Sequence, residues 1–432
     1  MRATLADRLT ALRRGDLAGA SELSLVGGLT EFPTEIFGLA DSLEVLDISG
    51  GSLTSLPAEI GRLTKLRVLF LSGNRFERMP PALGNCPSLS QIGMRNAGLR
   101  EVPSEALPAT LRWLTLTDNA IEILPDALGE RPHLQKLLLA GNRLRTLPEG
   151  LAAAKRLELI RLAANRFEAL PPWLVTLPSL AWLSYAGNPL EREMPLAGVA
   201  SVAWRDLTLG ERLGEGASGI THRASWRTEG EIRPIALKLF KGAMTSDGLP
   251  DREMAACLAA GAHPNLTSGL GRLTGHPEGA EGLAMRLLPS HWRALAGPPS
   301  LSSCSRDVYD PAMRIEAEVA LRLARAAASA AAHLHTRGLL HGDLYAHNLI
   351  WDGTSGECVL SDFGAASLLP SSEVDRCYER VEVRAWGLLL GELLDLCPAV
   401  PDTLRTLQHA CTQPDTAARP LMDEVLATLG EP

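Results

Sequence analysis

A glycine-rich segment, Gly214-x-Gly216-x-x-Gly219, follows directly on an apolar run that is expected to form a strand, Leu207 to Leu213. Glycines at this spacing let backbone N–H groups approach a phosphate closely. The pattern alone is a weak indicator, because dinucleotide-binding folds use the same spacing. Such a fold would continue into a helix, whereas here another strand is expected, followed by Ile-Ala-Leu-Lys at residues 235–238. The segment therefore favours a phosphate-binding loop between two strands.

Acidic and amide side chains that suit phosphate chemistry follow this loop in order. Glu253 lies 15 residues after Lys238, in an expected helix. The later segment HGDLYAHN contains Asp343 and Asn348, and Ser-Asp-Phe-Gly occupies residues 361–364. Oxygen ligands of this kind suit a hard cation, and a triphosphate brings matching charge. The expected pair is Mg²⁺ and ATP.

Together these motifs resemble the signature of the protein-kinase superfamily over residues 204 to 432. Ile-Ala-Leu-Lys matches the VAIK strand, HGDLYAHN the HRDLxxxN catalytic loop, and Asp-Phe-Gly the DFG motif. Residues 382–394, EVRAWGLLLGELL, resemble the helix written DVWSLGxxxxEL, and residues 411–420 resemble the closing motif. Six motifs in the right order imply an α+β bilobal protein-kinase-like domain.

The resemblance also implies a role for each matching position. Asp343 resembles the catalytic aspartate, which orients the substrate hydroxyl and accepts its proton. Lys238 is expected to hold the α- and β-phosphates, and Glu253 to position Lys238. The nucleotide-binding positions are expected to be Gly214, Gly216, Gly219, Ala236, Lys238 and Ile350, and the Mg²⁺ ligands Asn348 and Asp362.

Two departures from the family pattern lie in the catalytic loop. Gly342 replaces the arginine that, in the family, pairs with a phosphorylated activation loop, so this mode of control is expected to be absent. Tyr345 replaces the lysine that contacts the transferred phosphoryl group in Ser/Thr kinases. Tyrosine kinases do not place Tyr there either, so acceptor preference cannot be read from this position.

Two further departures follow the DFG motif. Only 20 residues separate Asp362 from Glu382, where the family has roughly 35, and no APE motif is present. Glu373 and Glu379 are both candidates for the position of the APE glutamate beside Arg419, and neither is favoured. Glu382 stands where the family has aspartate, a longer reach for the same carboxylate. A shortened segment removes much of the peptide-docking platform, which would shift substrate recognition to the other half of the chain.

That other half is a repeat array. The pattern LxxLxL begins at seven leucines spaced 23 residues apart, with one spacing of 22: Leu43, Leu66, Leu89, Leu111, Leu134, Leu157 and Leu180. A degenerate copy begins at Ala20, giving about eight units. Each unit contributes a short strand whose leucines can be buried only by neighbouring units, and a recurring asparagine is expected to satisfy the turn that follows. The array resembles the leucine-rich-repeat family.

The ends and the concave face of such an array carry further expectations. An N-terminal helix over residues 3–18 is expected to cap the solenoid, with a membrane-surface helix as the alternative. Strand alternation places the residues between the leucines on the concave face. Exposed aromatic and cationic residues there favour a protein partner, with packing against linkers, caps or the second domain as the alternative. The predicted partner surface consists of Phe70, Trp113, Lys136, Arg161 and Trp182.

Composition excludes several classes. The net charge of −8 and the pI of about 5.8 argue against a nucleic-acid partner. Seven scattered cysteines without CxxC spacing indicate reduced thiols. No window reaches the roughly 18 apolar residues that a transmembrane span needs. A soluble cytoplasmic protein is expected, and Ala-, Leu- and Arg-rich usage favours a bacterial type.

The fold expected is thus an α/β leucine-rich-repeat solenoid followed by the kinase-like domain. Expected boundaries are a helical cap at 1–19, repeats at 20–190, a linker at 191–203 and the kinase-like domain at 204–432. The leading functional hypothesis is an ATP-dependent protein kinase, with a Ser/Thr acceptor favoured over Tyr, whose repeats recruit a substrate or regulator. The alternatives are a pseudokinase that serves as an ATP-binding scaffold and a kinase for a small-molecule or lipid acceptor.

Overall fold

The computed structural model describes residues 4–191, 200–228, 230–242, 244–245, 247–370 and 375–430. The chain divides into two compact units. The first contains residues 1–160 and 165–179, and the second contains residues 161–164 and 180–432. The last strands of the repeat array are therefore shared between the units, and part of the predicted linker lies outside the described residues. The domain boundaries given above remain predictions.

The first unit begins with helix α1 (Leu5–Arg14). Thr4 caps it in a capping box with Asp7, and Gly15 ends it in the left-handed conformation, at φ +79°. The helix is therefore shorter than the 3–18 range expected from the sequence, because a cap closes it at each end. Leu12 is its buried residue, which gives the helix one apolar contact face.

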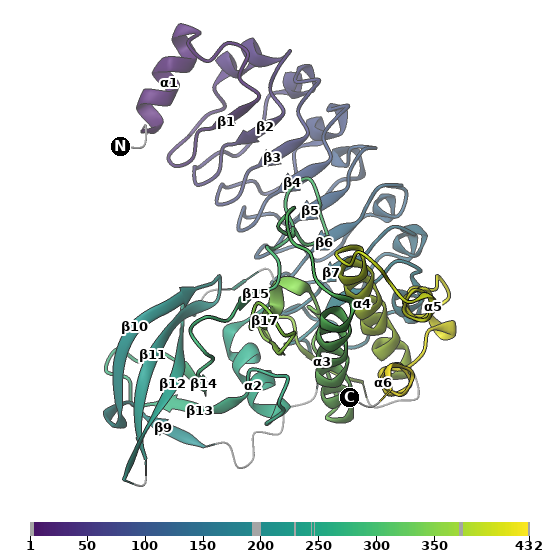
Figure 1. The fold of residues 1–432 in the computed structure, drawn as a ribbon. Coiled ribbons are helices and arrows are strands. Elements are labelled where there is room, and N and C mark those ends of the chain that lie inside the picture. Colours follow the sequence, from purple (N-terminus) through teal and green to yellow (C-terminus); the bar gives the residue numbers. More distant parts are fainter. Residues whose placement is uncertain are drawn as a thin grey trace. The chain divides into compact units, whose positions relative to one another are not determined.

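The repeats form one eight-stranded sheet whose strands follow chain order from β1 to β8 (Figure 1). The strands are β1 (Glu22–Ser24), β2 (Val45–Asp47), β3 (Val68–Phe70), β4 (Gln91–Gly93), β5 (Trp113–Thr115), β6 (Lys136–Leu138), β7 (Leu159–Arg161) and β8 (Trp182–Ser184). Neighbouring strands from β1 to β6 pair in parallel. Short 3-10 helices return the chain between strands: η1 (Thr34–Leu39), η2 (Ala58–Arg62), η3 (Pro81–Asn85), η4 (Ser104–Ala106), η5 (Asp126–Leu128), η6 (Glu149–Ala153) and η7 (Pro172–Thr176). The leucine-rich-repeat solenoid predicted from the spacing is confirmed.

The recurring asparagine satisfies backbone groups of two neighbouring repeats, as expected. Asn74 donates to the carbonyl groups of Ile48 and Leu71, both at 2.9 Å, and accepts from the N–H of Leu53 at 3.0 Å. Asn142 repeats the arrangement three repeats further on, with bonds to Leu116, Leu139 and Ile121. A buried amide that makes three hydrogen bonds holds each turn in register with the turn before it.

The second unit has a six-stranded sheet with the order β10-β11-β12-β14-β13-β9. Its strands are β9 (Ser201–Ala203), β10 (Leu207–Glu215), β11 (Gly219–Thr228), β12 (Glu231–Phe240), β13 (Gly269–Thr274) and β14 (Gly282–Arg286). Helix α2 (Pro250–Ala260) packs on β13. The core of this lobe consists of Val202, Ala224, Ile235, Leu237, Leu273 and Ala284.

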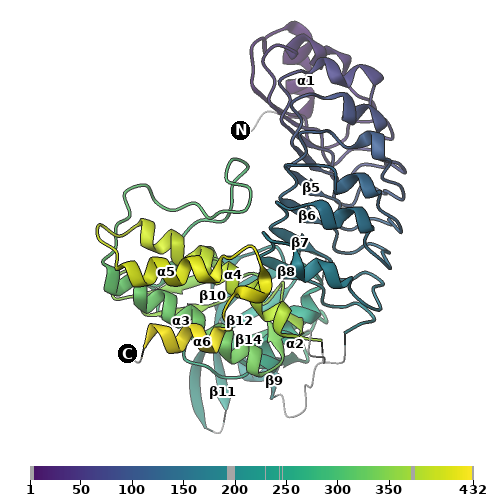
Figure 2. The same cartoon turned by 90° about the vertical axis from the view of Figure 1, so that its right-hand side faces the viewer.

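The second lobe of this unit is mainly helical, with α3, α4, α5 and α6 grouped together (Figure 2). The helices are α3 (Ala317–Thr336), α4 (Asp375–Asp395), α5 (Asp402–Cys411) and α6 (Met422–Leu429), with the 3-10 segments η8 (Trp204–Asp206), η9 (Ala346–Asn348) and η10 (Thr416–Ala418) elsewhere in the unit. Two small sheets are also present. One consists of β15 (Arg293–Ala294), β17 (Leu349–Trp351) and β18 (Cys358–Leu360), and the other of β16 (Leu339–Leu340) and β19 (Ser367–Leu368). The buried indole of Trp386 on α4 donates to Ala324 O on α3 at 2.8 Å. The bilobal α+β domain is confirmed.

Candidate active site

The lysine and glutamate predicted to form a pair are in contact. Lys238 lies on β12, and its ammonium group is hydrogen-bonded to the carboxylate of Glu253 on α2. Both side chains are largely buried. Burial raises the pKa of Glu253 and the nearby charge of Asp362 adds to that rise, while Lys238 opposes it. The contact joins β12 of the sheet to α2, as the predicted role of Glu253 requires.

A cavity of about 400 Å³ lies beside this pair. Its wall contains three positions predicted to bind the nucleotide, Gly214, Ala236 and Ile350. Asp362, Lys238 and Glu253 line it as well. A pocket of this volume with apolar walls and a few charged groups at one end suits a nucleotide.

The glycines of the phosphate-binding segment differ in what they require. Positions 214 and 216 have open space where a Cβ would stand, whereas a Cβ at Gly219 would lie 2.5 Å from Leu239 O. Gly216 N donates to Gly219 O at 2.9 Å, which closes the turn. Lys241 supports the same turn through Gly216 O at 3.1 Å and the carboxylate of Glu215 at 2.5 Å. The first two glycines are thus exposed, and Gly214 lines the cavity, whereas the third permits close strand packing.

The catalytic-loop aspartate and asparagine are joined directly. Asn348 donates through Nδ2 to Asp343 Oδ2 and to Asp343 O, both at 2.8 Å. His347 accompanies them: its Nδ1 lies 2.7 Å from Asp307 Oδ1, and its Nε2 lies 3.9 Å from Asp343 Oδ2. Burial alone would lower the pKa of His347, but its hydrogen bond to Asp307 and the charge of Asp343 hold it above the ordinary value. The loop is therefore anchored from behind by an imidazole–carboxylate pair.

The residues predicted to bind Mg²⁺ fit that ion by their chemistry. Asn348 uses its amide nitrogen on Asp343, which leaves its side-chain oxygen for a cation. Asp362 has φ +63° and accepts from Gly364 N at 3.0 Å, so its carboxylate is held in the tight turn of the DFG motif. Across the described part of the chain there is no cluster of three or more His, Cys, Asp or Glu suited to a metal. Two oxygen ligands with phosphate oxygens completing the shell are typical of Mg²⁺.

The departure at Gly342 has a structural cause. This residue has φ +73°, and a Cβ there would stand 2.6 Å from Ala365 O and 2.7 Å from Leu183 O. Its N–H donates to Glu382 at 2.7 Å. Glu382 is buried and also accepts from His335 at 2.8 Å, so the longer carboxylate does reach the catalytic loop from α4. Position 342 has no room for a side chain, so it cannot carry the cation that the family pattern has there.

Arg161, predicted to belong to a partner surface, lies within the second unit at the catalytic loop. Its Nε donates to Asp247 Oδ1 at 2.7 Å, one terminal nitrogen donates to Gly342 O at 2.8 Å, and the other to Asp343 Oδ1. Only 2% of its side chain is exposed. Burial alone would lower the pKa of Arg161, but the charges of Asp343 and Asp247 hold it above the ordinary value. Strand alternation places Arg161 on the concave side of β7, but nothing in the sequence indicates its contact with the catalytic loop.

The electrostatic consequence falls on Asp343. Burial alone would raise the pKa of this carboxyl, but the charge of Arg161, followed by those of His347 and His341, holds it below the ordinary value. Asp343 is therefore an ionised acceptor whose two oxygens are bound on one side by a guanidinium and on the other by an amide.

Trp182 is also buried within the second unit. Its ring stacks on Tyr345 with centroids 4.1 Å apart and planes within 6°, and its indole N–H donates to Leu344 O at 3.0 Å. The guanidinium carbon of Arg306 lies over the Trp182 ring, 5.2 Å from its centroid. Arg161 and Trp182 therefore correct the prediction of a partner surface: packing within the chain, the alternative interpretation, describes these two residues. Tyr345, where the family has lysine, serves as a stacking partner.

The shortened segment after the DFG motif is held by residues that follow β8. Ser367 Oγ on β19 accepts from Tyr185 N at 2.9 Å, and Tyr185 donates its hydroxyl to Leu368 O at 2.8 Å. Glu191 accepts from Leu368 N at 3.3 Å and lies 3.7 Å from Arg252 of α2. Residues at the end of the repeat array thus support the segment after the DFG motif, which is shorter here than in the family pattern.

The two candidates for the APE glutamate have different outcomes. Glu379 lies 3.8 Å from His335, and Glu373 lies outside the described residues. Arg419 is buried and donates to Gln413 O at 2.8 Å and to Arg380 O at 3.2 Å. Burial lowers the pKa of Arg419 to about 9. Backbone carbonyl groups therefore receive this arginine.

The other residues of the predicted partner surface lie on strands of the first unit. Lys136 on β6 places its ammonium group 4.1 Å from the ring centroid of Trp113 on β5. The indole N–H of Trp113 donates to Thr115 at 3.0 Å, and both Trp113 and Lys136 are half-buried. Phe70 covers Gly93 of the next strand, where a Cβ would stand 2.8 Å from its ring. This cation–aromatic pair suits recognition of a protein surface, and its role stays a prediction.

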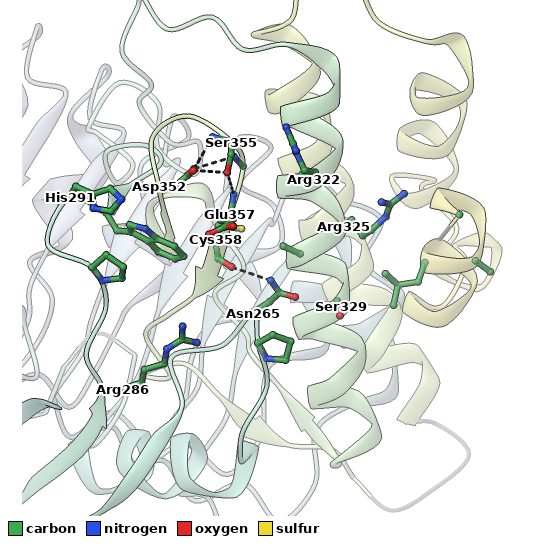
Figure 3. A pocket seen from close by; sticks show the side chains of 18 residues that line it. Asn265, Arg286, His291, Arg322, Arg325, Ser329, Asp352, Ser355, Glu357 and Cys358 are labelled. Atoms are coloured by element: carbon green, nitrogen blue, oxygen red, sulfur yellow. Dashed lines mark hydrogen bonds between the residues drawn. The ribbon is translucent and has the colours of Figure 1, made fainter. Parts of the chain in front are cut away.

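A larger cavity of about 1060 Å³ is lined by none of the predicted catalytic or metal-binding residues (Figure 3). Asn265, Arg286 and Arg325 are among its lining residues, and Asn265 donates to Cys358 O at 3.1 Å. Asp352 also lines this cavity, but its carboxylate accepts hydrogen bonds from Ser355 in a turn. Burial alone would raise the pKa of Asp352, but these hydrogen bonds hold it below the ordinary value. Of the predicted catalytic and metal-binding residues, Lys238, Glu253 and Asp362 line the smaller cavity, whereas Asp343 and Asn348 are not among its lining residues.

Comparisons with known proteins agree with this arrangement. A family model described as protein tyrosine and serine/threonine kinase matches residues 207–386, and a leucine-rich-repeat model matches residues 65–86. The chain is similar to probable serine/threonine-protein kinase SIS8 of Arabidopsis thaliana, at 24% identity over 277 residues, which are 53% of this chain and 25% of that protein. Within this chain, residues 207–386 match a protein-kinase model and residues 65–86 match a leucine-rich-repeat model, in the same order as the two folds described above.

Two further relatives match about a quarter of this chain. Plant intracellular Ras-group-related LRR protein 8 of Oryza sativa subsp. japonica is 32% identical over 112 residues, 26% of this chain and 25% of that protein. Disease resistance protein RFL1 of Arabidopsis thaliana is 33% identical over 113 residues, 26% of this chain and 13% of that protein. The chain spans a quarter or less of these curated relatives. The expectation of a bacterial type is not supported, because these relatives are plant proteins.

Among the described residues, none of the helices is long and apolar enough to cross a membrane. The seven cysteines all lie in the described part of the chain and are free thiols.

Proposed function

We propose that this chain is an ATP-dependent protein kinase that transfers the γ-phosphoryl group to Ser or Thr side chains. The observation that carries the proposal is the coexistence of the Lys238–Glu253 pair with the hydrogen-bonded Asp343–Asn348 pair. A chain that only bound nucleotide would have no use for an ionised, oriented carboxylate at the position of the proton acceptor. The similarity to a probable serine/threonine-protein kinase favours Ser/Thr as the acceptor.

In the proposed reaction the acceptor oxygen forms a bond to the γ-phosphorus. The bond from that phosphorus to the β–γ bridging oxygen breaks, and its electron pair leaves with ADP. The hydroxyl proton passes to Asp343. Lys238 would hold the α- and β-phosphates, and the backbone of the segment from Gly214 to Gly219 would close over the nucleotide. Asn348 and Asp362 would hold Mg²⁺, which neutralises charge on the phosphates when bound.

The repeats would recruit a protein substrate or regulator through the part of the concave face that carries Phe70, Trp113 and Lys136. The cation–aromatic pair of Lys136 and Trp113 supports this role, because half-buried aromatic residues with a cation are common anchors for a partner. A cytoplasmic location is part of the proposal and is supported by the seven free thiols.

The alternative of an ATP-binding pseudokinase is motivated by one contact. Arg161 occupies one oxygen of Asp343, and a guanidinium in that place could exclude an acceptor hydroxyl. A small-molecule or lipid acceptor is motivated by the short segment between Asp362 and Glu382, which leaves little platform for a peptide.

The test is phosphate transfer from γ-labelled ATP with Mg²⁺, comparing the wild type with Asp343→Asn and Lys238→Ala. The acceptors are a Ser/Thr/Tyr peptide library and a panel of small-molecule alcohols. We expect label on Ser and Thr in the wild type, a loss of about 1,000-fold in Asp343→Asn with unchanged ATP binding, and weakened ATP binding in Lys238→Ala. ATP binding without transfer by the wild type would establish the pseudokinase, and label only on small molecules would establish the other alternative.

A further inference from the structure

One guanidinium joins three segments of the second unit. Arg161 lies at the end of β7, Asp247 lies in the loop that leads into α2, and Asp343 lies in the catalytic loop. Helix α2 also carries Glu253, the partner of Lys238. The two loops that must be correctly placed for phosphoryl transfer therefore share a single buried cation.

The strand end that supplies this cation is firmly held. Leu162 N donates to Ser184 O and Ala164 N to Ala186 O, both at 2.8 Å. Asn188 donates to Leu162 O at 3.0 Å and so fixes the turn after β7. The backbone after Arg161 is therefore held in place, and because only 2% of the Arg161 side chain is exposed, the guanidinium is enclosed within the site.

The catalytic loop has no cation of its own at the positions where the family pattern has arginine and lysine. Gly342 has no room for a side chain, and Tyr345 is occupied in stacking. Arg161 brings a positive charge to the same loop from a residue 182 positions earlier. Because the guanidinium is a rigid planar fork, its bonds to Asp247 and to Gly342 O fix its own place and rotation, and its third bond then holds Asp343 Oδ1.

The carboxylate that results has one defined orientation. Oδ1 accepts from Arg161 and Oδ2 accepts from Asn348, so neither oxygen can rotate away without losing a hydrogen bond to a buried partner. Each carboxylate oxygen has a further lone pair, which leaves acceptor capacity for a substrate hydroxyl. Preorganised charge of this kind lowers a reaction barrier without reorganisation at the moment of transfer.

We propose that Arg161, supplied by the repeat array, is a positioning residue for phosphoryl transfer that orients Asp343 and couples it to the loop before α2. The proposal rests on the proposed kinase function and deepens it: the end of the array is part of the catalytic unit, in addition to any recruiting role of the repeats. Arg161 acts through Asp343 and is assigned no contact with the substrate.

The test measures kcat and the KM for ATP with dephosphorylated casein as acceptor, using the full chain and Mg²⁺. The variants are Arg161→Gln, Arg161→Lys and Arg145→Gln, the last being a matched control because Arg145 is an exposed arginine of the same array.

We expect kcat to fall about 100-fold in Arg161→Gln, with KM for ATP changed no more than about threefold. Arg161→Lys should recover about tenfold of that loss, because it keeps the charge but lacks the fork. Arg145→Gln should equal the wild type.

Removal of Arg161 leaves two carboxylates near one another without their cation, so folding is checked by the Kd for ATP and by thermal unfolding. If Arg161→Gln does not fold, Arg161→Lys decides, with an expected loss of about tenfold in kcat at unchanged KM. A matching loss of kcat and ATP affinity in both variants would indicate a merely structural role and overturn the proposal.

The remaining outcomes separate this proposal from the proposed function. Turnover of Arg161→Gln equal to the wild type overturns the positioning role alone. Faster turnover of Arg161→Gln, or turnover only in that variant, identifies Arg161 as an inhibitory plug while the kinase function stands. An absence of Asp343-dependent transfer in the wild type and every variant overturns the kinase function, and the positioning role with it.

Discussion

Trp182 and Tyr345 lie face to face, with ring centroids 4.1 Å apart and planes within 6° of parallel. The first residue belongs to the last strand of the repeat sheet and the second to the catalytic loop. Among the residues that the structure describes, none hydrogen-bonds the buried Tyr345 hydroxyl, so the ring is held by its contacts with Trp182 and with His347, whose ring centroid is 5.0 Å away. Stacking of two large buried rings makes this contact a main support of the catalytic loop.

We therefore expect Trp182→Ala to lower the free energy of unfolding by about 3–5 kcal/mol and to reduce phosphate transfer with it. Trp182→Phe keeps an aromatic face but loses the hydrogen bond to Leu344 O, and should cost about 1–3 kcal/mol. Urea unfolding followed by circular dichroism measures the first effect, and autophosphorylation the second. Equal stability of the alanine variant and the wild type would contradict the assigned role of the stack.

A second prediction concerns Gly342. Substitution by alanine should destabilise the chain by at least about 3 kcal/mol, because the new Cβ would meet Ala365 O and Leu183 O at 2.6 and 2.7 Å in addition to the strain of φ +73°. Gly338→Ala is a matched control: its φ is +71°, and a Cβ there meets nothing within 4 Å. The control should lose only about 1 kcal/mol from backbone strain. Similar losses in the two variants, measured by thermal or urea unfolding, would show that crowding at position 342 is unimportant.

The same reasoning applies to Gly342→Arg, which restores the residue that the family has at this position. We expect this variant to be less stable and less active than the wild type, since the arginine side chain has to displace two backbone carbonyl groups. The measurement is the transfer rate per folded molecule, with folding checked by ATP binding. A gain in activity would indicate that the loop tolerates the family residue.

A third prediction separates recruitment from catalysis. Trp113→Ala should remove the aromatic face above which Lys136 lies, at 4.1 Å, and so weaken capture of a protein partner without lowering autophosphorylation. Lys136→Met serves as the companion variant, because it keeps the length of the side chain and removes the charge. Pull-down of partners from lysate, compared with the autophosphorylation rate of the same preparations, checks the expectation. Unchanged capture in both variants would remove this pair from the proposed partner surface.

Sequence reasoning was most effective where spacing along the chain determines contact. The paired residues Lys238 and Glu253 lie on a strand and the next helix, and Asp343 and Asn348 lie in one loop, so local geometry brings each pair together. The repeat fold followed from its period, because a strand with leucines on one face has no stable place except beside another copy. Strand alternation likewise placed Arg161 on the concave side of β7.

The rest could not be predicted, because it depends on which distant surfaces meet. The partners of Arg161 are 86, 181 and 182 residues away in the sequence, and no periodicity relates them to β7. Gly342 and Tyr345 were interpreted as losses from the family pattern, yet each is matched by a group from β8: a backbone carbonyl at the first and an indole ring at the second. A departure from a motif carries information about the tertiary partner, but a single sequence does not identify that partner.

The last prediction concerns pH. Glu392 on α4 accepts a hydrogen bond from the Tyr309 hydroxyl at 3.1 Å. Burial raises the pKa of Glu392 to about 7; Asp307 adds to the rise, Arg306 opposes it, and Asp395 adds a smaller effect. Because Asp307 also holds His347 behind the catalytic loop, this carboxyl belongs to the support of the site.

The pKa of this carboxyl is higher in the folded chain than in the unfolded chain, where it is about 4.3. Its contribution to stability is therefore fully present below the pKa of the unfolded chain and is lost as the pH rises through the pKa of the folded chain. Wild-type stability should therefore fall between about pH 5 and pH 8 relative to Glu392→Gln, by about 1–3 kcal/mol. Glu318→Gln, at an exposed position of α3, should leave the pH dependence of the wild type unchanged. Urea unfolding at intervals from pH 5 to pH 9 provides the measurement. If the curves of Glu392→Gln and the wild type run parallel, the Glu392 carboxyl has an ordinary pKa in the folded chain, and the hydrogen bond from Tyr309 is then made to a carboxylate throughout this range.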